Sequence, residues 1–287
     1  MGRVMRTPGY RCLISIVALL FALLVVTGCS SDARVESPGR PLQSDPFGDL
    51  NDIPAPTTPQ SASPPLNTGD MLAVPAGAVF LAEQIDWADI SGYFVSVAIP
   101  DNIYYRIDGR SYVENPYVSI DDLRYLKLLH YNFDHNIQVG ELIVSAELAD
   151  EFLEILLELF DEEYEIYSMY LVEEFWNEDA IITDDESCFA NNTSAFSYRE
   201  ITYGGSLSMH AFGEAIDINP LQNPYVEYYN GEPWWLDSNA DDYIDRSAGL
   251  PHMIDYDDAC YQAFASRGWT WGGDWWSPKD YQHFEKW

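Results

Sequence analysis

The sequence predicts an α+β fold, in which a small central sheet of mostly antiparallel strands is flanked by helices. Three observations lead to this prediction. Several short segments alternate apolar and polar residues, as half-buried strands do, and longer segments repeat apolar residues at helical spacing. The two kinds of segment do not alternate regularly along the chain, as they would in a doubly wound parallel sheet.

Three helices are expected. Apolar residues at helical spacing predict a long amphipathic helix over residues 146–163. Ser119 is a suitable N-cap for a helix over residues 120–129. A further helix is expected over residues 257–267, because Gly268 follows it as a C-terminal stop signal.

The expected strands are short. Val95, Val97 and Ile99 alternate with other residues, and Pro100 ends the segment. Further strands are predicted at residues 137–144, 167–172, 215–219, 269–271 and 283–286.

The N-terminus has the features of an export signal. Residues 1–12 carry three arginines and no acid, and an apolar run of 14 residues follows from Leu13 to Val26. This run is short for a membrane-spanning helix. The sequence Val-Thr-Gly-Cys that ends at Cys29 resembles the bacterial lipoprotein box, which implies a signal peptide over residues 1–28 and lipidation of Cys29. An ordinary cleaved signal that happens to end near a cysteine is the alternative.

The next segment is expected to be a tether. Nine of the 17 prolines lie between Pro38 and Pro75, among Ser, Thr, Gln and Asp. This composition favours an extended, solvated spacer over residues 29–76, followed by one globular domain over residues 77–287. With its lipid anchor, the protein would sit outside the cytoplasm, held on a membrane.

The charge balance excludes one class of function. The chain has 14 Lys and Arg against 47 Asp and Glu, a net charge of −33, whereas binding to nucleic acid needs a basic face. We expect most of the acids to form a solvated surface that keeps the protein soluble and monomeric. The alternative is that some of them select a cationic group on a substrate.

Potential metal ligands are concentrated near the C-terminus. His210, Asp217 and His283 supply two imidazoles and one carboxylate, the donor types that Zn²⁺ prefers. A catalytic zinc site has three protein ligands and leaves a fourth position to water or substrate.

The sequence around Asp217 suits such a site. In a strand over residues 215–219, Asp217 points to one face while Ile216 and Ile218 point to the other. Gly213 gives the chain the conformational freedom to turn back between His210 and Asp217.

These residues also carry a family resemblance. Ser-x-His-x-x-Gly-x-Ala-x-Asp over residues 208–217, followed by Asp-x-x-His over 280–283, resembles the family of D-alanyl-D-alanine carboxypeptidases and L-alanyl-D-glutamate endopeptidases. These are zinc peptidases of peptidoglycan stem peptides, with a fold related to the lysostaphin and hedgehog zinc domains. The similarity spans roughly residues 120–287 and includes three further segments: 140–144, 192–199 and Trp-Gly-Gly-Asp-Trp over 271–275.

The resemblance implies that His210, Asp217 and His283 bind zinc and that Asp280 is the general acid/base. A residue three positions before a ligand can reach a water molecule at the metal. Endopeptidase members carry Asp at this place, which mildly favours that branch. The alternative is a purely structural role, in which Asp280 caps a turn.

Two further roles follow from the resemblance. Arg199 matches an arginine that contacts the substrate carbonyl or oxyanion, but in so acidic a protein it could be a structural ion-pair partner. Ser208 matches a position that lines the substrate cleft, but it could simply hydrogen-bond the loop backbone.

Two other patterns remain open. Cys188 and Cys260 are the cysteines of the exported domain and could form a disulfide outside the cytoplasm. The acidic loop over residues 237–245 resembles part of a calcium loop, but Asp242 and Ala248 stand where a glycine and a bidentate acid are needed.

The predicted function is therefore zinc-dependent hydrolysis of stem-peptide bonds, with peptidoglycan stem peptides as partners and Zn²⁺ as cofactor. One alternative is a catalytically inactive zinc-containing domain that binds or scaffolds the cell wall. Another is a peptidase of non-wall peptides. If the protein does act on stem peptides, the cationic group that its acids could select is, for example, the free amine of a diamino acid.

Overall fold

The computed structural model describes residues 65–201, 204–236 and 238–287. The predicted signal peptide, Cys29 and most of the tether lie outside these residues. The folded part begins before residue 77, where the sequence placed the boundary. A 3₁₀ helix covers Thr68–Ala73. Leu66 and Met71 are only 6% and 1% exposed, because their side chains pack into the main core.

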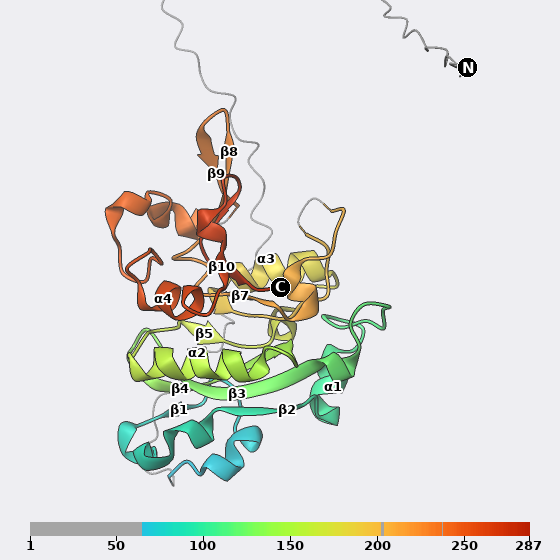
Figure 1. Ribbon diagram of the computed structural model, residues 1–287, viewed down its shortest axis with the longest axis vertical. Helices are drawn as coiled ribbons and strands as arrows, with labels where there is room; N and C mark the ends of the chain where they lie inside the picture. Colours follow the sequence, from blue (N-terminus) through green and yellow to red (C-terminus); the bar gives the residue numbers. More distant parts are fainter. Residues whose placement is uncertain (1–64, 202–203, 237) are drawn as a thin grey trace, which may run out of the picture. The chain divides into compact units, whose positions relative to one another are not determined.

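The predicted α+β class is confirmed (Figure 1). The largest sheet is antiparallel and has the order β1-β4-β3-β2. Its strands are β1 (Val79–Phe80), β4 (Ile137–Ser145), β3 (Leu123–Tyr131) and β2 (Val95–Ala98). Helix α2 (Ala149–Asp161) packs against β3 and β2 and buries the apolar stripe that predicted it.

The helix predicted over residues 120–129 is wrong. Ser119 and Asp122 do form a capping arrangement, but it covers a single 3₁₀ turn, Ile120–Asp122. The chain then enters β3, which lies between β2 and β4. All residues of β3 except Arg124 are buried, so pairing and burial on both faces override the local helix signal.

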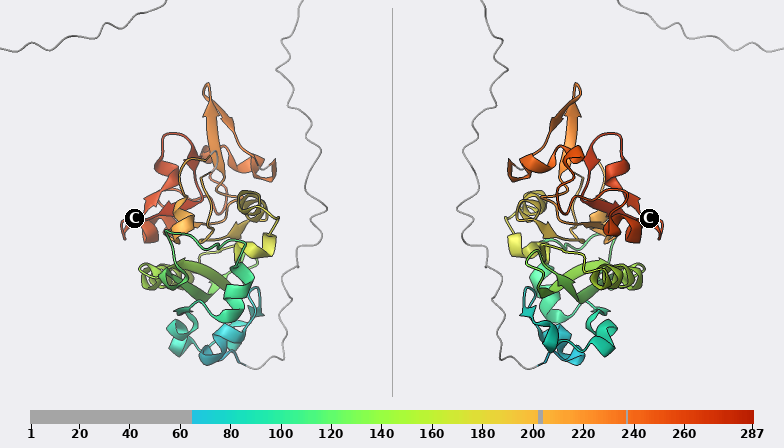
Figure 2. Two further views of the ribbon diagram at one scale, coloured as in Figure 1. Left: turned by 90° about the vertical axis from the view of Figure 1, so that its right-hand side faces the viewer. Right: turned by 90° about the vertical axis from the view of Figure 1, so that its left-hand side faces the viewer.

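The second half of the chain forms two more small antiparallel sheets. One has the order β10-β12-β7, with β10 (Thr270–Trp271), β12 (His283–Glu285) and β7 (Ala215–Asp217), and α4 (Ala259–Ala265) packs beside β10. The other has the order β11-β8-β9, with β11 (Lys279–Asp280), β8 (Tyr225–Tyr229) and β9 (Glu232–Trp234). The β8–β9 hairpin projects from the rest of the described structure (Figure 2).

Some elements were not predicted. The hairpin has a recognisable signal: Asn230 and Gly231 both have positive φ, and Asn-Gly is the favoured two-residue hairpin turn. Helices α1 (Asp101–Ile107) and α3 (Ala180–Phe189) lack long apolar periodicity. The strand expected at 167–172 is only β5 (Ser168–Met169), paired in parallel with β6 (Asn192–Thr193).

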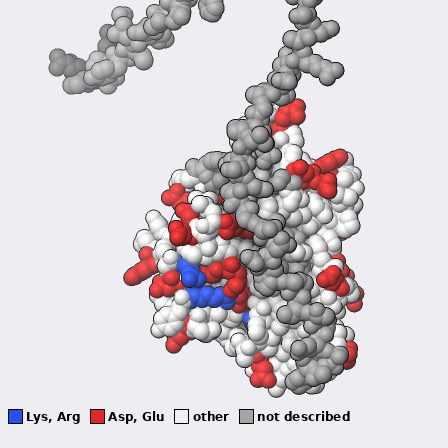
Figure 3. All heavy atoms as spheres, turned by 180° about the vertical axis from the view of Figure 1, so that it is seen from behind, with Lys and Arg blue, Asp and Glu red and all other residues white. Residues whose placement is uncertain are grey.

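The surface agrees with the acidic composition. On the face in Figure 3, carboxylates are scattered widely, while the visible Lys and Arg atoms gather in one small group. In the described part of the chain, no helix is both long and apolar enough to cross a membrane.

Candidate metal centre

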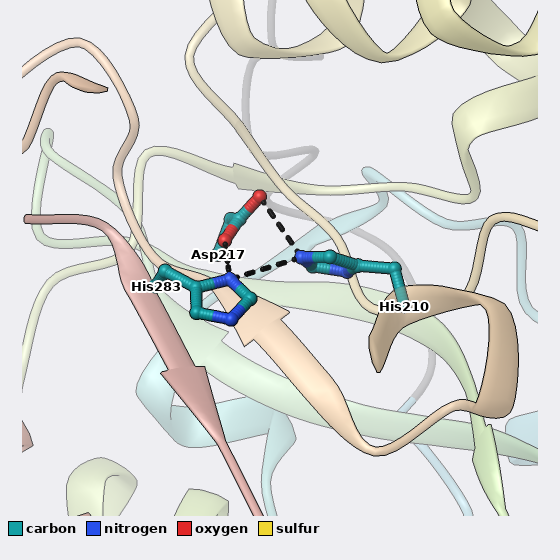
Figure 4. Close-up of side chains that lie close together, drawn as sticks. All are labelled: His210, Asp217 and His283. Atoms are coloured by element: carbon teal, nitrogen blue, oxygen red, sulfur yellow. Dashed lines mark hydrogen bonds and ion pairs between the residues drawn. The ribbon is translucent and has the colours of Figure 1, made fainter. Parts of the chain in front are cut away.

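His210, Asp217 and His283 converge in space, as the sequence predicts. All three are buried, and their potential ligand atoms lie within 4.8 Å of one another. His283 Nδ1 is 3.0 Å from Asp217 Oδ1, and His210 Nε2 is 3.3 Å from Asp217 Oδ2. The two imidazole nitrogens are 3.2 Å apart (Figure 4). Among the described residues, this is the only group of three or more His, Cys, Asp or Glu side chains that could share an ion.

Strand pairing positions two of the three residues. His283 in β12 and Asp217 in β7 are direct antiparallel partners, so their side chains lie on the same face of the sheet. The neighbouring pair, Phe284 and Ile216, is fully buried on the opposite face. The alternation predicted for Asp217 is therefore confirmed.

His210 comes from a short turn with defined ends. It lies in a 3₁₀ helix, Met209–Phe212, where the Ser208 hydroxyl accepts a hydrogen bond from the His210 amide at 3.3 Å. Gly213 ends the helix with φ of +70°, and a Cβ there would lie 2.4 Å from the Ser145 amide nitrogen. Only glycine fits this position, which confirms the role predicted for Gly213.

Each potential ligand has a second partner that orients it. His210 Nδ1 donates to the Ala195 carbonyl, so Nε2 presents its lone pair to the centre. His283 Nε2 lies 3.2 Å from Glu285 Oε2, and Gln282 Nε2 donates to Asp217 Oδ2 at 3.3 Å. Such outer contacts are typical of metal-binding histidines and carboxylates.

This donor set fits a zinc ion. Burial alone would raise the pKa of Asp217, but the His210 and His283 imidazoles bring it well below its usual range. Burial alone would lower the pKa of His283, but the Asp217 and Glu285 carboxylates raise it to about 10. The centre is thus a buried cluster of lone pairs and negative charge that holds positive charge strongly, as a zinc site of two imidazoles and a carboxylate does.

Asp280 lies beside this centre and lines the same cavity, which has a volume of about 650 Å³. Its buried Oδ1 has no hydrogen-bond partner among the described residues, so this oxygen caps no turn. Burial, followed by the Asp217 charge, raises the pKa of Asp280 to about 7. A buried carboxyl group without a structural partner is suited to taking up and releasing a proton.

The absence of a side chain at Gly272 allows the backbone of Asp280 to pack against it. A Cβ on Gly272 would lie 2.5 Å from the Asp280 carbonyl oxygen, 2.8 Å from the Asp280 Cβ and 3.2 Å from the His283 Cβ. The Trp-Gly-Gly-Asp-Trp segment therefore packs directly against the backbone that carries both residues.

Arg199 lines the cavity, but it is also an ion-pair partner. Its Nη2 lies 2.5 Å from Asp184 Oδ2, and the two side chains are only 9% and 12% exposed. Its Nε is buried without a partner among the described residues. The ion pair that we gave as the alternative is therefore present.

Ser208 caps the turn that carries His210, as the alternative proposed, and it also lines the cavity. The sequence missed Asp184, which contacts Arg199 from α3, and it missed Trp234 and Trp235, which line the cavity together with Trp275. Asp184 stands 15 residues before Arg199 and has no local motif that marks it.

The possible disulfide between Cys188 and Cys260 is not formed. Cys188 and Cys260 are both thiols. Cys188 lies in α3 at the cavity wall, where Gln282 Nε2 donates to its sulfur at 3.6 Å. Cys260 is fully buried in α4, within the main core, so the two sulfurs belong to different surroundings.

The acidic loop shows no calcium geometry in its described part. Asp237 lies outside the described residues. Asp241 accepts a hydrogen bond from Trp235 Nε1 at 2.7 Å, and Asp245 caps the 3₁₀ helix Arg246–Ala248. Both carboxylates therefore already accept hydrogen bonds from other groups of the protein.

Comparison with known proteins supports the class of the site. Residues 202–286 match the family model described as D-alanyl-D-alanine carboxypeptidase. The match contains the three potential metal ligands and Asp280, and it supports the family resemblance that the motifs carry. Together with the geometry of the site, it points to a peptidase. Comparisons with curated proteins and with solved structures found no match.

Proposed function

We propose that this protein hydrolyses peptide bonds in peptidoglycan stem peptides and that zinc is its cofactor. The observation that carries the proposal is the convergence of His210, Asp217 and His283 on one side of a cavity that Asp280 also lines. The family match over residues 202–286 supports it independently.

The proposed roles follow from the contacts. His210 Nε2, His283 Nδ1 and an Asp217 oxygen would hold the ion. When bound, zinc would act as a Lewis acid and would lower the pKa of a water molecule that it binds. Asp280 takes the proton from the attacking water and delivers it to the leaving amine, since its buried carboxyl group has no competing partner on Oδ1.

Arg199 would stabilise the charge that develops on the carbonyl oxygen. Its Nη2 is bonded to Asp184 and its Nη1 to the Glu200 carbonyl, whereas its buried Nε has no hydrogen-bond partner among the described residues. Asp184 would act as a positioning residue that keeps the guanidinium at the cavity wall. Ser208 would line the same cleft next to His210.

The experiment is turnover of defined muropeptides by the zinc-loaded protein, with products identified by mass spectrometry. Hydrolysis of a stem-peptide bond would support the proposal, and the product masses would distinguish a carboxypeptidase from an L-Ala-D-Glu-type endopeptidase. Ordinary L-peptides serve as the comparison for a non-wall peptidase. Tight muropeptide binding without any turnover would favour the inactive binding or scaffold domain instead.

We also propose that the protein is exported and anchored through lipid on Cys29, which would place the domain in the bacterial cell envelope. We further propose that it is a monomer, because its strongly acidic surface opposes self-association. The support for the anchor is the basic and apolar N-terminus that ends in Val-Thr-Gly-Cys. A Cys29→Ala variant should lose acyl labelling and leave the membrane fraction. Unchanged labelling and fractionation would contradict the anchor.

A further inference from the structure

The charges that line the cavity point away from recognition of a terminal carboxylate. Six carboxylates line the cavity: Asp184, Asp185, Asp217, Glu227, Asp280 and Glu285. Arg199 is the only Lys or Arg among the lining residues, and Asp184 already neutralises it. Even with a zinc ion bound, the six carboxylates outweigh the charges of the ion and Arg199, so a substrate carboxylate would meet net negative charge, whereas an ammonium group would be attracted.

Glu227 is the carboxylate best placed to receive an ammonium group. Its Oε1 accepts a hydrogen bond from the Tyr225 hydroxyl at 3.1 Å, and its Oε2 accepts one from the Tyr229 hydroxyl. These neutral donors orient the carboxylate but do not cancel its charge. No Lys, Arg or His of the described residues lies within ion-pair distance of it.

Three aromatic residues of the hairpin lie next to this carboxylate. Tyr225, Glu227 and Tyr229 alternate along β8 and so lie on one face of the strand. Trp234 of β9 is the direct cross-strand partner of Glu227, so it lies on the same face. Tyr225, Glu227 and Trp234 all line the cavity. A carboxylate among Tyr and Trp rings is the arrangement that recognises organic ammonium groups, through charge and cation–π attraction.

The distance to the reaction centre can be read from the strand register. Tyr225 is the cross-strand partner of Asp280, and Glu227 lies two residues further along β8. Two residues of an extended strand span about 7 Å. The long, flexible side chain of a lysine-like residue at or beside the cut bond can cover this distance.

We infer that Glu227, Tyr225 and Trp234 form a subsite for a primary ammonium group on the substrate. On the proposed function, on which this inference rests, the preferred substrate is a stem peptide whose diamino acid has a free side-chain amine. A cross-linked peptide, in which that amine is an amide, would lose the ion pair with Glu227. The cavity would thus favour uncross-linked peptides cut at an internal bond.

The test uses two synthetic stem pentapeptides that differ only in acetylation of the lysine ε-amine. Binding is measured by calorimetry in the zinc-loaded Asp280→Asn protein, and turnover is measured separately in the wild type. The free-amine peptide should bind roughly tenfold more tightly, a preference typical of a charge-assisted hydrogen bond in a partly exposed site. Glu227→Gln should abolish the preference. The matched control is Glu232→Gln, an exposed acid on the same hairpin that does not line the cavity, and it should keep the preference.

The two readouts separate the subsite from the activity. Equal binding of both peptides, no binding of either, or an unchanged preference in Glu227→Gln would overturn the subsite. A clear preference in binding without turnover by the wild type would instead support the subsite and contradict the peptidase function.

Discussion

His283 and Asp217 are direct partners across β12 and β7, with His283 Nδ1 3.0 Å from Asp217 Oδ1. The backbone ladder of the two strands fixes this relationship, so two of the three potential metal ligands are set before any ion binds. The third, His210, is held by the Ser208 cap at one end of its turn and by Gly213 at the other. The centre is therefore preorganised, and its supporting contacts can be tested one at a time.

Gly272→Ala tests the packing behind the centre. The new Cβ would lie 2.5 Å from the Asp280 carbonyl oxygen and 3.2 Å from the His283 Cβ, so the backbone of Asp280 must move and the His283 side chain must shift slightly. Because a displacement of about 1 Å can cost about 100-fold in rate, kcat should fall by about that factor. Gly69→Ala is the control, since its Cβ would meet no atom closer than 3.5 Å. Equal kcat values for the two variants would show that the close approach does not matter.

Asp280→Asn tests the proton-transfer role. The substitution keeps the size of the side chain but removes its ability to accept a proton, and Asp280 is not one of the three converging ligands. Bound zinc should remain, while kcat should fall by roughly 10²–10⁴-fold with little change in KM. Zinc content and kcat are measured on the same preparation. Loss of zinc would make Asp280 a ligand, and full activity would assign the base to another acid.

The affinity for zinc should depend on pH. In the metal-free protein the Asp217 and Glu285 carboxylates overcome the effect of burial and raise the pKa of His283 to about 10, so this imidazole is protonated at neutral pH. Zinc must displace that proton. Below a pH of about 10, affinity should therefore rise up to about tenfold for each unit of pH. Competition with a chelator at pH 6.5 and 7.5 measures this, and an affinity that is equal at the two values would argue against a protonated His283.

Asp184→Asn tests the ion pair that holds Arg199. The substitution leaves a guanidinium that is 9% exposed without its anion. Breaking a buried pair in this way typically costs about 3–5 kcal/mol, which should appear in the free energy of unfolding in urea. Asp150→Asn, which removes an exposed carboxylate on α2, is the control. If both variants are as stable as the wild type, the pair has no structural role and Arg199 is held by other contacts.

The sequence predicted the three potential metal ligands because they stand in short motifs. Strand alternation placed the side chains of Asp217 and Ile216 on opposite faces of the sheet, and the structure confirms this. The Ser119 cap misled the prediction of the next segment, since a local signal cannot show that β3 lies between two other strands. Asp184 could not be assigned a role, because its contact with Arg199 arises only once α3 lies at the cavity. The partners of Glu227 lie within its own hairpin, but the sequence does not show that this hairpin borders the cavity.

The most direct test of the proposed zinc centre is elemental analysis of the full-length protein, purified without chelator. We predict close to one zinc per chain in the wild type. His283→Ala should lose this metal together with activity, because it removes one of three converging ligands. The absence of a near-stoichiometric divalent metal in the wild type, or full zinc content in His283→Ala, would contradict the account.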